Sequence, residues 1–285
     1  MTTAFTPRPR FIWPDQKRCA AMICFDVDGE TTALSEGAEL AARMTTISQT
    51  RYGPVVGVPR LLGLLKHLSI PATFFIPTYI VENYPQTCRA IRDAGHEIGA
   101  HGHLHEKLIT LDPAQERAVL EKSLKIMDTV LGLRPAGYRA PWFELNPGTI
   151  DLIAEYGFNY SASLMDDDAP YRHTNGVVEI PGQWLLEDWE QFAFNAEPAW
   201  GSIPQDVDKV YTLWWREFEA MRDYGCCFTL TLHPWLSGRP SRVQLLERLF
   251  TAMLGTGDVW FATGSEVAGY VIEHPEARHE ITLEK

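Results

Sequence analysis

Residues 19–30 read CAAMICFDVDGE, an apolar run that ends in two carboxylates, Asp26 and Asp28, one residue apart. Such a run is typical of a buried β-strand. Further apolar, β-rich runs occupy residues 72–77, 96–101, 137–141, 160–164, 177–181, 226–233 and 259–263. Helical patterns lie between most of these runs, at residues 57–69, 84–95, 112–131, 147–157, 206–224 and 241–254.

This alternation of strands and helices predicts parallel strands that are joined by right-handed crossovers. The helical patterns carry their own signals: Leu61, Leu65 and Leu68 fall at helical spacing, and Asp112 followed by Pro113 is typical of a helix start. Seven or eight strand–helix units in 285 residues favour an α/β fold with a barrel-like sheet. Because no linker or repeat interrupts the alternation, we expect a single domain over residues 1–285.

A second polar motif, HGHLHE at residues 101–106, follows the apolar run 96–101. It places His101 and His105 four residues apart, with His103 between them. Aspartate and histidine suit Zn²⁺ or a similar divalent ion, and three protein ligands leave one position open for water. Each motif alone is also compatible with an ordinary turn. Together, at the ends of two predicted strands where active sites collect, they favour a metal-activated hydrolase.

The composition excludes several classes of partner. The net charge is −12 and the basic residues form no cluster, so nucleic acid and anionic membranes are poor partners. No run approaches the roughly 20 apolar residues of a membrane span, and the first residues lack the apolar core of a signal peptide. The five cysteines lack C-x-x-C spacing and are expected to be reduced thiols of a cytoplasmic protein.

Two long connections, residues 30–56 and 182–205, interrupt the alternation. Long connections at the active edge of a barrel are usually functional, and we expect these to cover the site. Five tryptophans lie in or after such loops and could form an aromatic-walled pocket or simply pack in the core: Trp142, Trp184, Trp189, Trp200 and Trp235. The apolar residues in both connections also favour a homo-oligomer, a dimer or a tetramer.

Other enzyme classes explain the motifs less well. The sequence FDVDGET also resembles the nucleophile motif of haloacid-dehalogenase phosphatases, but Glu30 stands where those enzymes carry threonine. That interpretation, like a nucleotide-sugar transferase with an Asp-x-Asp motif, leaves His101, His105 and His233 without a role. A zincin motif is excluded, because His96 and His101 are separated by one residue too many for H-E-x-x-H.

The motif set resembles the polysaccharide deacetylases, the NodB-homology domains of carbohydrate esterase family 4. The resemblance covers roughly residues 18–270 and rests on five motifs in order: residues 25–30, residues 101–105, RAPW at 139–142, Asp188-Trp189, and LTLHP at 230–234. It implies a distorted (β/α) barrel of about seven parallel strands with long loops over the C-terminal edge.

The resemblance also implies roles for individual residues. Asp28, His101 and His105 would bind a divalent metal, most simply Zn²⁺ with Co²⁺ or another ion as an alternative. Asp26 would be the general base, Arg139 would pair with it, and His233 would protonate the leaving nitrogen. Four further residues are candidates for substrate contact or for support of the metal ligands: Glu30, His103, Glu106 and Trp142.

One departure from the family pattern concerns the substrate. Val27 separates two aspartates that are usually adjacent, and this spaced form resembles an intracellular subgroup that includes peptidoglycan-deacetylase-like proteins, cyclic imidases and ureide hydrolases. We therefore expect metal-dependent hydrolysis of a non-peptide C–N bond, with removal of an acetyl group from an N-acetylated sugar. The alternative is hydrolysis of a small cyclic imide or ureide, and a third reading is a non-catalytic sugar-binding protein.

Overall fold

The computed structural model describes residues 9–279. Among these, eight parallel strands and one antiparallel edge strand form a single sheet in the order β10-β1-β2-β3-β4-β5-β7-β6, with β11 beside β1. The strands are β1 (Cys19–Asp26), β2 (Thr73–Ile76), β3 (Glu97–Ala100), β4 (Gly137–Tyr138), β5 (Tyr160–Ser161), β6 (Tyr171–Arg172), β7 (Val178–Glu179), β10 (Cys227–Leu232) and β11 (Val259–Phe261). The eight parallel strands lie at the eight predicted runs, so the predicted parallel α/β sheet is confirmed.

The first strand, β1, is the centre of the sheet and is buried along its whole length. It pairs with β10 on one side, in the register Phe25 opposite Leu232, and with β11 and then β2 on the other. The chain that follows β7 returns to the free edge of β10, where Glu187 and Thr231 form a single parallel β-bridge. The sheet therefore curls into the distorted barrel that we expected.

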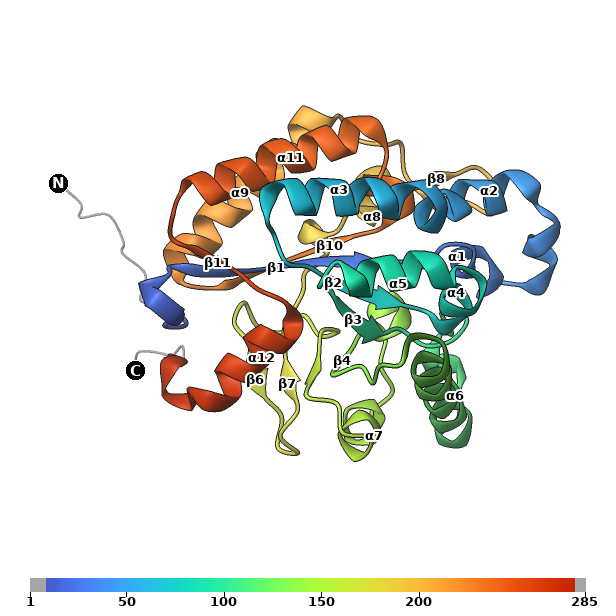
Figure 1. Cartoon of the computed structure of the whole chain (residues 1–285), viewed down its shortest axis with the longest axis horizontal. Helices are drawn as coiled ribbons and strands as arrows, with labels where there is room; N and C mark the ends of the chain where they lie inside the picture. The colour runs from blue at the N-terminus through green and yellow to red at the C-terminus, as the bar shows by residue number, and fades with distance from the viewer. Residues whose placement is uncertain (1–8, 280–285) are drawn as a thin grey trace.

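Helices cover the sheet at all six predicted positions. These are α3 (Val58–Leu68), α5 (Pro85–Asp93), α6 (Pro113–Leu131), α7 (Thr149–Glu155), α9 (Val207–Tyr224) and α11 (Pro240–Gly255). Asp112 caps α6 as predicted, because its carboxylate accepts from the backbone N–H groups of Ala114 and Gln115. Figure 1 shows α3, α9 and α11 on one side of the sheet, and α6, α7 and α12 (Gly264–Glu273) on the other.

The two long connections are mostly ordered into short elements that the sequence pattern did not predict. Residues 30–56 contain α1 (Thr31–Leu34), η2 (Ala38–Ala42), α2 (Met44–Tyr52) and all but the last residue of η3 (Gly53–Gly57). Residues 182–205 contain η6 (Trp184–Leu186), α8 (Trp189–Phe192), β8 (Phe194–Asn195) and β9 (Trp200–Gly201). In Figure 1, α1, α2 and α4 (Thr78–Asn83) gather at the end toward which the arrow of β1 points. The connection 30–56 thus lies at the active edge.

A close approach explains why η3 ends with glycine. A side chain at Gly57 would place its Cβ 2.2 Å from the carbonyl oxygen of Pro234, in α10 (Pro234–Ser237). Only glycine allows this contact between η3 and the helix that follows β10. The remaining short helices are η1 (Pro14–Gln16), η4 (Leu108–Thr110), η5 (Pro141–Phe143) and η7 (Pro275–Ala277).

Two expectations from composition can be compared with the described part of the chain. All five cysteines are buried and free, as expected for structural thiols. No helix within residues 9–279 combines the length and the apolar character needed to cross a bilayer.

Candidate metal centre and catalytic pocket

Four strand ends deliver the predicted catalytic and metal-binding residues to one place. Asp26 is the last residue of β1, while His101, Arg139 and His233 directly follow β3, β4 and β10. Because parallel strands end at the same edge of the sheet, these side chains meet there. Each of them is at most 5% exposed, so their interactions are formed almost without solvent.

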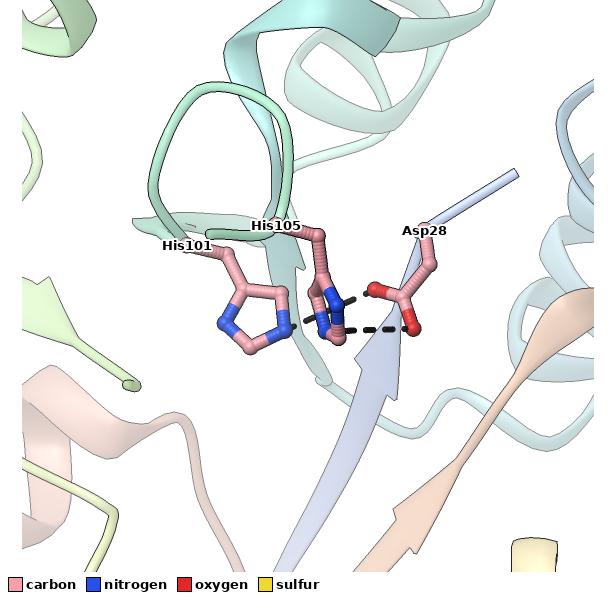
Figure 2. A group of neighbouring side chains, drawn as sticks. All are labelled: Asp28, His101 and His105. Atoms are coloured by element: carbon pink, nitrogen blue, oxygen red, sulfur yellow. Dashed lines mark ion pairs between the residues drawn. The ribbon is translucent and has the colours of Figure 1, made fainter. Parts of the chain in front are cut away.

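Asp28, His101 and His105 form a compact group with the geometry of a metal site. Nε2 of His101 lies 3.5 Å from Oδ1 of Asp28, and Nε2 of His105 lies 3.6 Å from Oδ2 (Figure 2). One donor atom from each residue can be chosen so that all three lie within 4.8 Å of one another. Around a tetrahedral ion with ligand distances of about 2.1 Å, neighbouring ligand atoms lie roughly 3.4 Å apart. The three side chains therefore fit a divalent ion.

The polar environment of these residues also fits a cation. Nδ1 of His101 lies 2.8 Å from the carbonyl oxygen of Arg139 and can donate to it, which leaves the Nε2 lone pair directed toward Asp28. Oδ1 of Asp28 is buried and has no hydrogen-bond partner among the described residues. Burial, helped by the charges of His101 and His233, lowers the pKa of His105 well below its ordinary value and favours the neutral, metal-binding imidazole.

The loop between the two histidines is ordered by Glu106. Its carboxylate accepts hydrogen bonds of 2.9 Å from the backbone N–H groups of both His103 and Leu104. Gly102 and His105 both have positive φ, and a Cβ at Gly102 would lie 2.8 Å from Oε2 of Glu106. This tight, carboxylate-capped turn brings the His105 ring back beside His101, at a centroid distance of 4.9 Å.

Hydrogen bonds show where three of the four supporting candidates lie. Glu106 binds backbone N–H groups rather than an imidazole, and Glu30 accepts instead from the hydroxyl of Tyr84. The His103 ring lies beside Thr78 and Lys122, at 3.0 and 2.7 Å, and does not line the catalytic pocket. A histidine in the middle of an H-x-x-x-H loop has no sequence signal that shows which way it points.

Asp26 and Arg139 form a fully buried ion pair. Nη1 of Arg139 lies 2.9 Å from Oδ1 of Asp26, and its Nε donates to the carbonyl oxygen of Ala162. The guanidinium also packs over the rings of Phe75 and Phe143. Burial would lower the pKa of Arg139, but the groups around the guanidinium, with the Asp26 charge first among them, together raise it. The pair fixes one oxygen of Asp26 and leaves Oδ2 facing His101 at 3.9 Å.

His233 is held by Asp188, which the sequence analysis identified only as part of an Asp-Trp motif. Oδ1 of Asp188 lies 2.7 Å from Nδ1 of His233, and Oδ2 accepts from the His233 backbone N–H at 2.9 Å and from the Ser237 hydroxyl. Nε2 of His233 then faces Asp28 at 3.5 Å. Burial alone would lower the pKa of His233, but the neighbouring carboxylates, Asp188 first and Asp28 next, raise it well above its ordinary value.

A pocket of about 160 Å³ joins these groups. Its lining residues are Asp26, Asp28, Thr32, His101, His105, Trp142, Phe143, Trp184, Glu187, Trp189, Glu190 and His233. Three of the five tryptophans singled out in the sequence thus form its wall, and Trp142 lies 5.1 Å from the His105 ring. Trp200 and Trp235 are buried and contact the Trp189 ring instead.

Glu187 is a pocket residue that sequence reasoning missed. The residue is 5% exposed, Oε1 lies 3.9 Å from Nε2 of His233, and Oε2 has no hydrogen-bond partner among the described residues. Burial raises the pKa of Glu187 well above its ordinary value, which favours a protonated carboxyl that can donate a hydrogen bond. The only feature of the sequence that could have indicated this role is the position of Glu187 directly before Asp188. Glu190, one turn further on, lies at the solvent-exposed rim.

Comparison with known proteins agrees with this geometry. Residues 52–161 match the family model of polysaccharide deacetylase. The chain is 32% identical to the peptidoglycan deacetylase of Helicobacter pylori over 255 residues, which cover 78% of this chain and 86% of that protein. It is 28% identical to a peptidoglycan deacetylase-like protein of Gibberella zeae, with 89% and 86% covered.

Solved structures extend the similarity over nearly the whole chain. A Mycobacterium smegmatis protein assigned to the polysaccharide deacetylases superimposes with a TM-score of 0.92 at 41% identity, covering 99% of this chain and all of that one. PuuE allantoinase superimposes with a TM-score of 0.81 at 26% identity, with 95% and 96% covered. The buried Asp and His groups, the curled parallel sheet and these relatives lead to one conclusion. The chain belongs to the polysaccharide deacetylase family of hydrolases, which act on carbon–nitrogen bonds other than peptide bonds.

Proposed function

We propose that this protein removes the acetyl group from a small N-acetylated sugar, with a divalent ion, most simply Zn²⁺, bound by Asp28, His101 and His105. The observation that carries the proposal is that one pocket is lined by the three ligand side chains, by Asp26, which Arg139 holds from behind, and by His233, which Asp188 supports. When bound, a divalent ion supplies Lewis-acid polarisation of the scissile carbonyl and acidifies water.

The side chains of this chain would carry the proton transfers. Asp26, with Oδ1 held by Arg139, presents Oδ2 to the pocket and can take a proton from the attacking water. Nε2 of His233 lies on the same side of the pocket as Asp28 and can give a proton to the leaving nitrogen. The hydrogen bond from Nδ1 of His233 to Asp188 fixes the ring orientation that this transfer needs.

The size of the pocket supports a small substrate rather than a polymer. Its volume of about 160 Å³ is below the roughly 300–1,000 Å³ typical of sites for drug-sized ligands. The rings of Trp142 and Trp189 lie 6.3 Å apart and, with Trp184 and Phe143, offer apolar surface to the face of a single sugar ring.

A second candidate is hydrolysis of a small cyclic ureide or imide. Two observations favour this reaction. PuuE allantoinase is similar in structure to 95% of this chain, and Glu187 and Glu190 add carboxyl groups to the pocket. Carboxyl oxygens accept hydrogen bonds from N–H groups, which such rings carry at their edges. An acetamido sugar presents fewer N–H donors and more hydroxyl groups.

One panel of substrates separates these possibilities. The protein, stripped with chelator and then reconstituted with Zn²⁺ or Co²⁺, would be assayed on N-acetylglucosamine, chitin oligomers, peptidoglycan, allantoin and simple cyclic imides. The proposal expects acetate release from the monosaccharide that depends on Asp26 and His233. Robust activity on polymers with none on small amides would contradict the size argument, and ring opening of allantoin alone would replace the first candidate by the second.

A further inference from the structure

A second cavity, of about 480 Å³, lies between α2, β8 and the start of α11. It shares no lining residue with the catalytic pocket, and it is formed by Thr45, Ser48, Gln49, Tyr52, Phe192, Phe194, Pro204, Trp235, Leu236, Arg239 and Arg242. The two arginines are the charged residues of this lining, whereas four carboxylate-bearing residues line the catalytic pocket. Two adjacent cavities therefore carry opposite charge, on a chain whose net charge is −12.

The arginines stand where positive charge is least favoured. Arg239 is the N-cap of α11, a helix of 16 residues, and Arg242 lies in its first turn, which contains no acidic residue. The N-terminus of a helix carries the positive end of its dipole, so cations are unfavourable there and anions are favourable. Burial, helped by the charge of Arg239, lowers the pKa of Arg242 against the opposing effect of Asp188.

A third arginine of the same helix, Arg248, has the carboxylate partner that Arg239 lacks. The guanidinium of Arg248 stacks over the Tyr211 ring at 3.7 Å and also forms a 2.7 Å ion pair with Asp208. Arg239 stacks over Tyr52 in the same way, at 3.6 Å, but its nearest polar contact is the carbonyl oxygen of Trp235 at 3.4 Å. No carboxylate in the described part of the chain pairs with it.

Arg242 has a further unsatisfied group. Its guanidinium lies over the ring of Phe192 at 4.9 Å, and its Nε is buried without a hydrogen-bond partner among residues 9–279. A buried N–H that lacks an acceptor is costly in a native protein. Two planar guanidinium groups, each with N–H donors, match the oxygens of a carboxylate or a phosphate.

We propose that this cavity, between Tyr52, Arg239 and Arg242, is a binding site for a small oxyanion, a carboxylate or a phosphate group. The ligand would supply the counter-charge that the two arginines and the N-terminus of α11 lack. The aromatic wall of Tyr52, Phe192 and Phe194 accommodates an apolar body that carries this anionic group.

The proposed site lies directly behind the catalytic pocket. Trp235 lines it and contacts Trp189 at 5.8 Å, and Trp189 contacts the His233 ring at 5.7 Å in the catalytic pocket. The short helix α10, which contains Trp235, begins directly after His233. The lining of this cavity therefore includes residues of α8 and α10, the two short helices next to the catalytic pocket.

Calorimetric titration with inorganic phosphate and, separately, with benzoate tests the proposal. Benzoate joins a carboxylate to an aromatic ring, so the two probes distinguish a phosphate from a carboxylate ligand. The wild type should bind at least one of them at one site per chain. Arg239→Gln and Arg242→Gln should each weaken binding by about tenfold or more, the effect of losing one charged hydrogen bond.

Two controls define the outcome. Arg248→Gln removes a stacked arginine from the same helix and should bind as the wild type does, and His101→Ala should also bind normally because it lies in the other pocket. Unfolding temperatures without anion would show that each variant is folded. Absence of saturable binding by both probes would overturn the proposal. Equal binding by Arg239→Gln, Arg242→Gln and the wild type, or loss of binding in His101→Ala, would do the same.

Discussion

Asp188 holds His233 by two atoms at once, accepting from its backbone N–H at 2.9 Å and from Nδ1 at 2.7 Å. The backbone contact fixes the end of β10, and the ring contact fixes the direction of Nε2. The carboxylate also raises the pKa of His233 against the opposing effect of burial. One buried aspartate thus sets the position, the orientation and the protonation of the expected proton donor.

The first prediction concerns Asp188→Asn. A protonated His233 is the acid, so activity is lost as pH rises through its pKa, and a raised pKa moves this loss to higher pH. Without the charge of Asp188 the pKa of His233 falls, and the basic limb of the kcat/KM profile should move to lower pH. At the optimum, kcat/KM should fall by about 10²-fold.

A pH profile on the best substrate from the panel measures this change. Asp151→Asn, an exposed carboxylate on α7, serves as the control and should leave the profile unchanged. An Asp188→Asn profile with the same basic limb as the wild type would show that Asp188 does not act through His233.

The second prediction asks whether Glu187 acts as a protonated carboxyl group or as an ionised carboxylate. If its protonated carboxyl donates a hydrogen bond to substrate, Glu187→Gln keeps a donor in place and should retain kcat/KM within a factor of about three. Glu187→Ala removes the donor and should lose about tenfold, near the value of one hydrogen bond. A Gln variant as impaired as the Ala variant would instead mean that the ionised carboxylate is needed.

The third prediction tests the buried ion pair between Asp26 and Arg139. Arg139→Met leaves the Asp26 charge buried without its partner and should lower the free energy of unfolding by about 3–5 kcal/mol. Adding Asp26→Asn removes the stranded charge, so the double variant should be more stable than Arg139→Met alone. Urea unfolding of the four proteins measures the cycle, and additive losses would contradict the coupling.

Much of this arrangement follows from the sequence, because each signal is local. The apolar run before Asp26 and the run before His101 predict strands, and parallel strands bring their carboxyl ends together. Burial of the Asp26–Arg139 pair and the pocket position of Trp142 agree with that reasoning.

What the sequence could not show depends on loop geometry. Glu106 caps a turn that requires positive φ at Gly102 and His105, and His103 points away from the pocket toward Lys122. Glu187 enters the pocket because the chain from β7 returns to bridge Thr231 at the edge of β10. None of these directions follows from hydrophobic periodicity, since the residues lie outside regular strands and helices.

The fourth prediction concerns assembly. Of the apolar residues in the two long connections, Leu186, Phe192 and Trp200 are buried within the chain, whereas Val55, Trp184 and Phe194 remain about half exposed, at 52%, 49% and 49%. We expect a dimer or a tetramer that covers them, measured by light scattering at micromolar concentration. Val55→Ser should weaken the assembly, and a monomeric wild type would contradict the prediction.

The central claim is that Asp28, His101 and His105 bind a divalent ion that activity needs. The most direct measurement is the metal content and kcat/KM of the wild type, His105→Ala and the neighbouring His103→Ala, each stripped with chelator and then titrated with Zn²⁺. We predict one ion per chain in the wild type and in His103→Ala, restored activity in the wild type, and loss of both ion and activity in His105→Ala. Full activity of the stripped wild type, or Zn²⁺ binding by His105→Ala as tight as that of the wild type, would contradict the account.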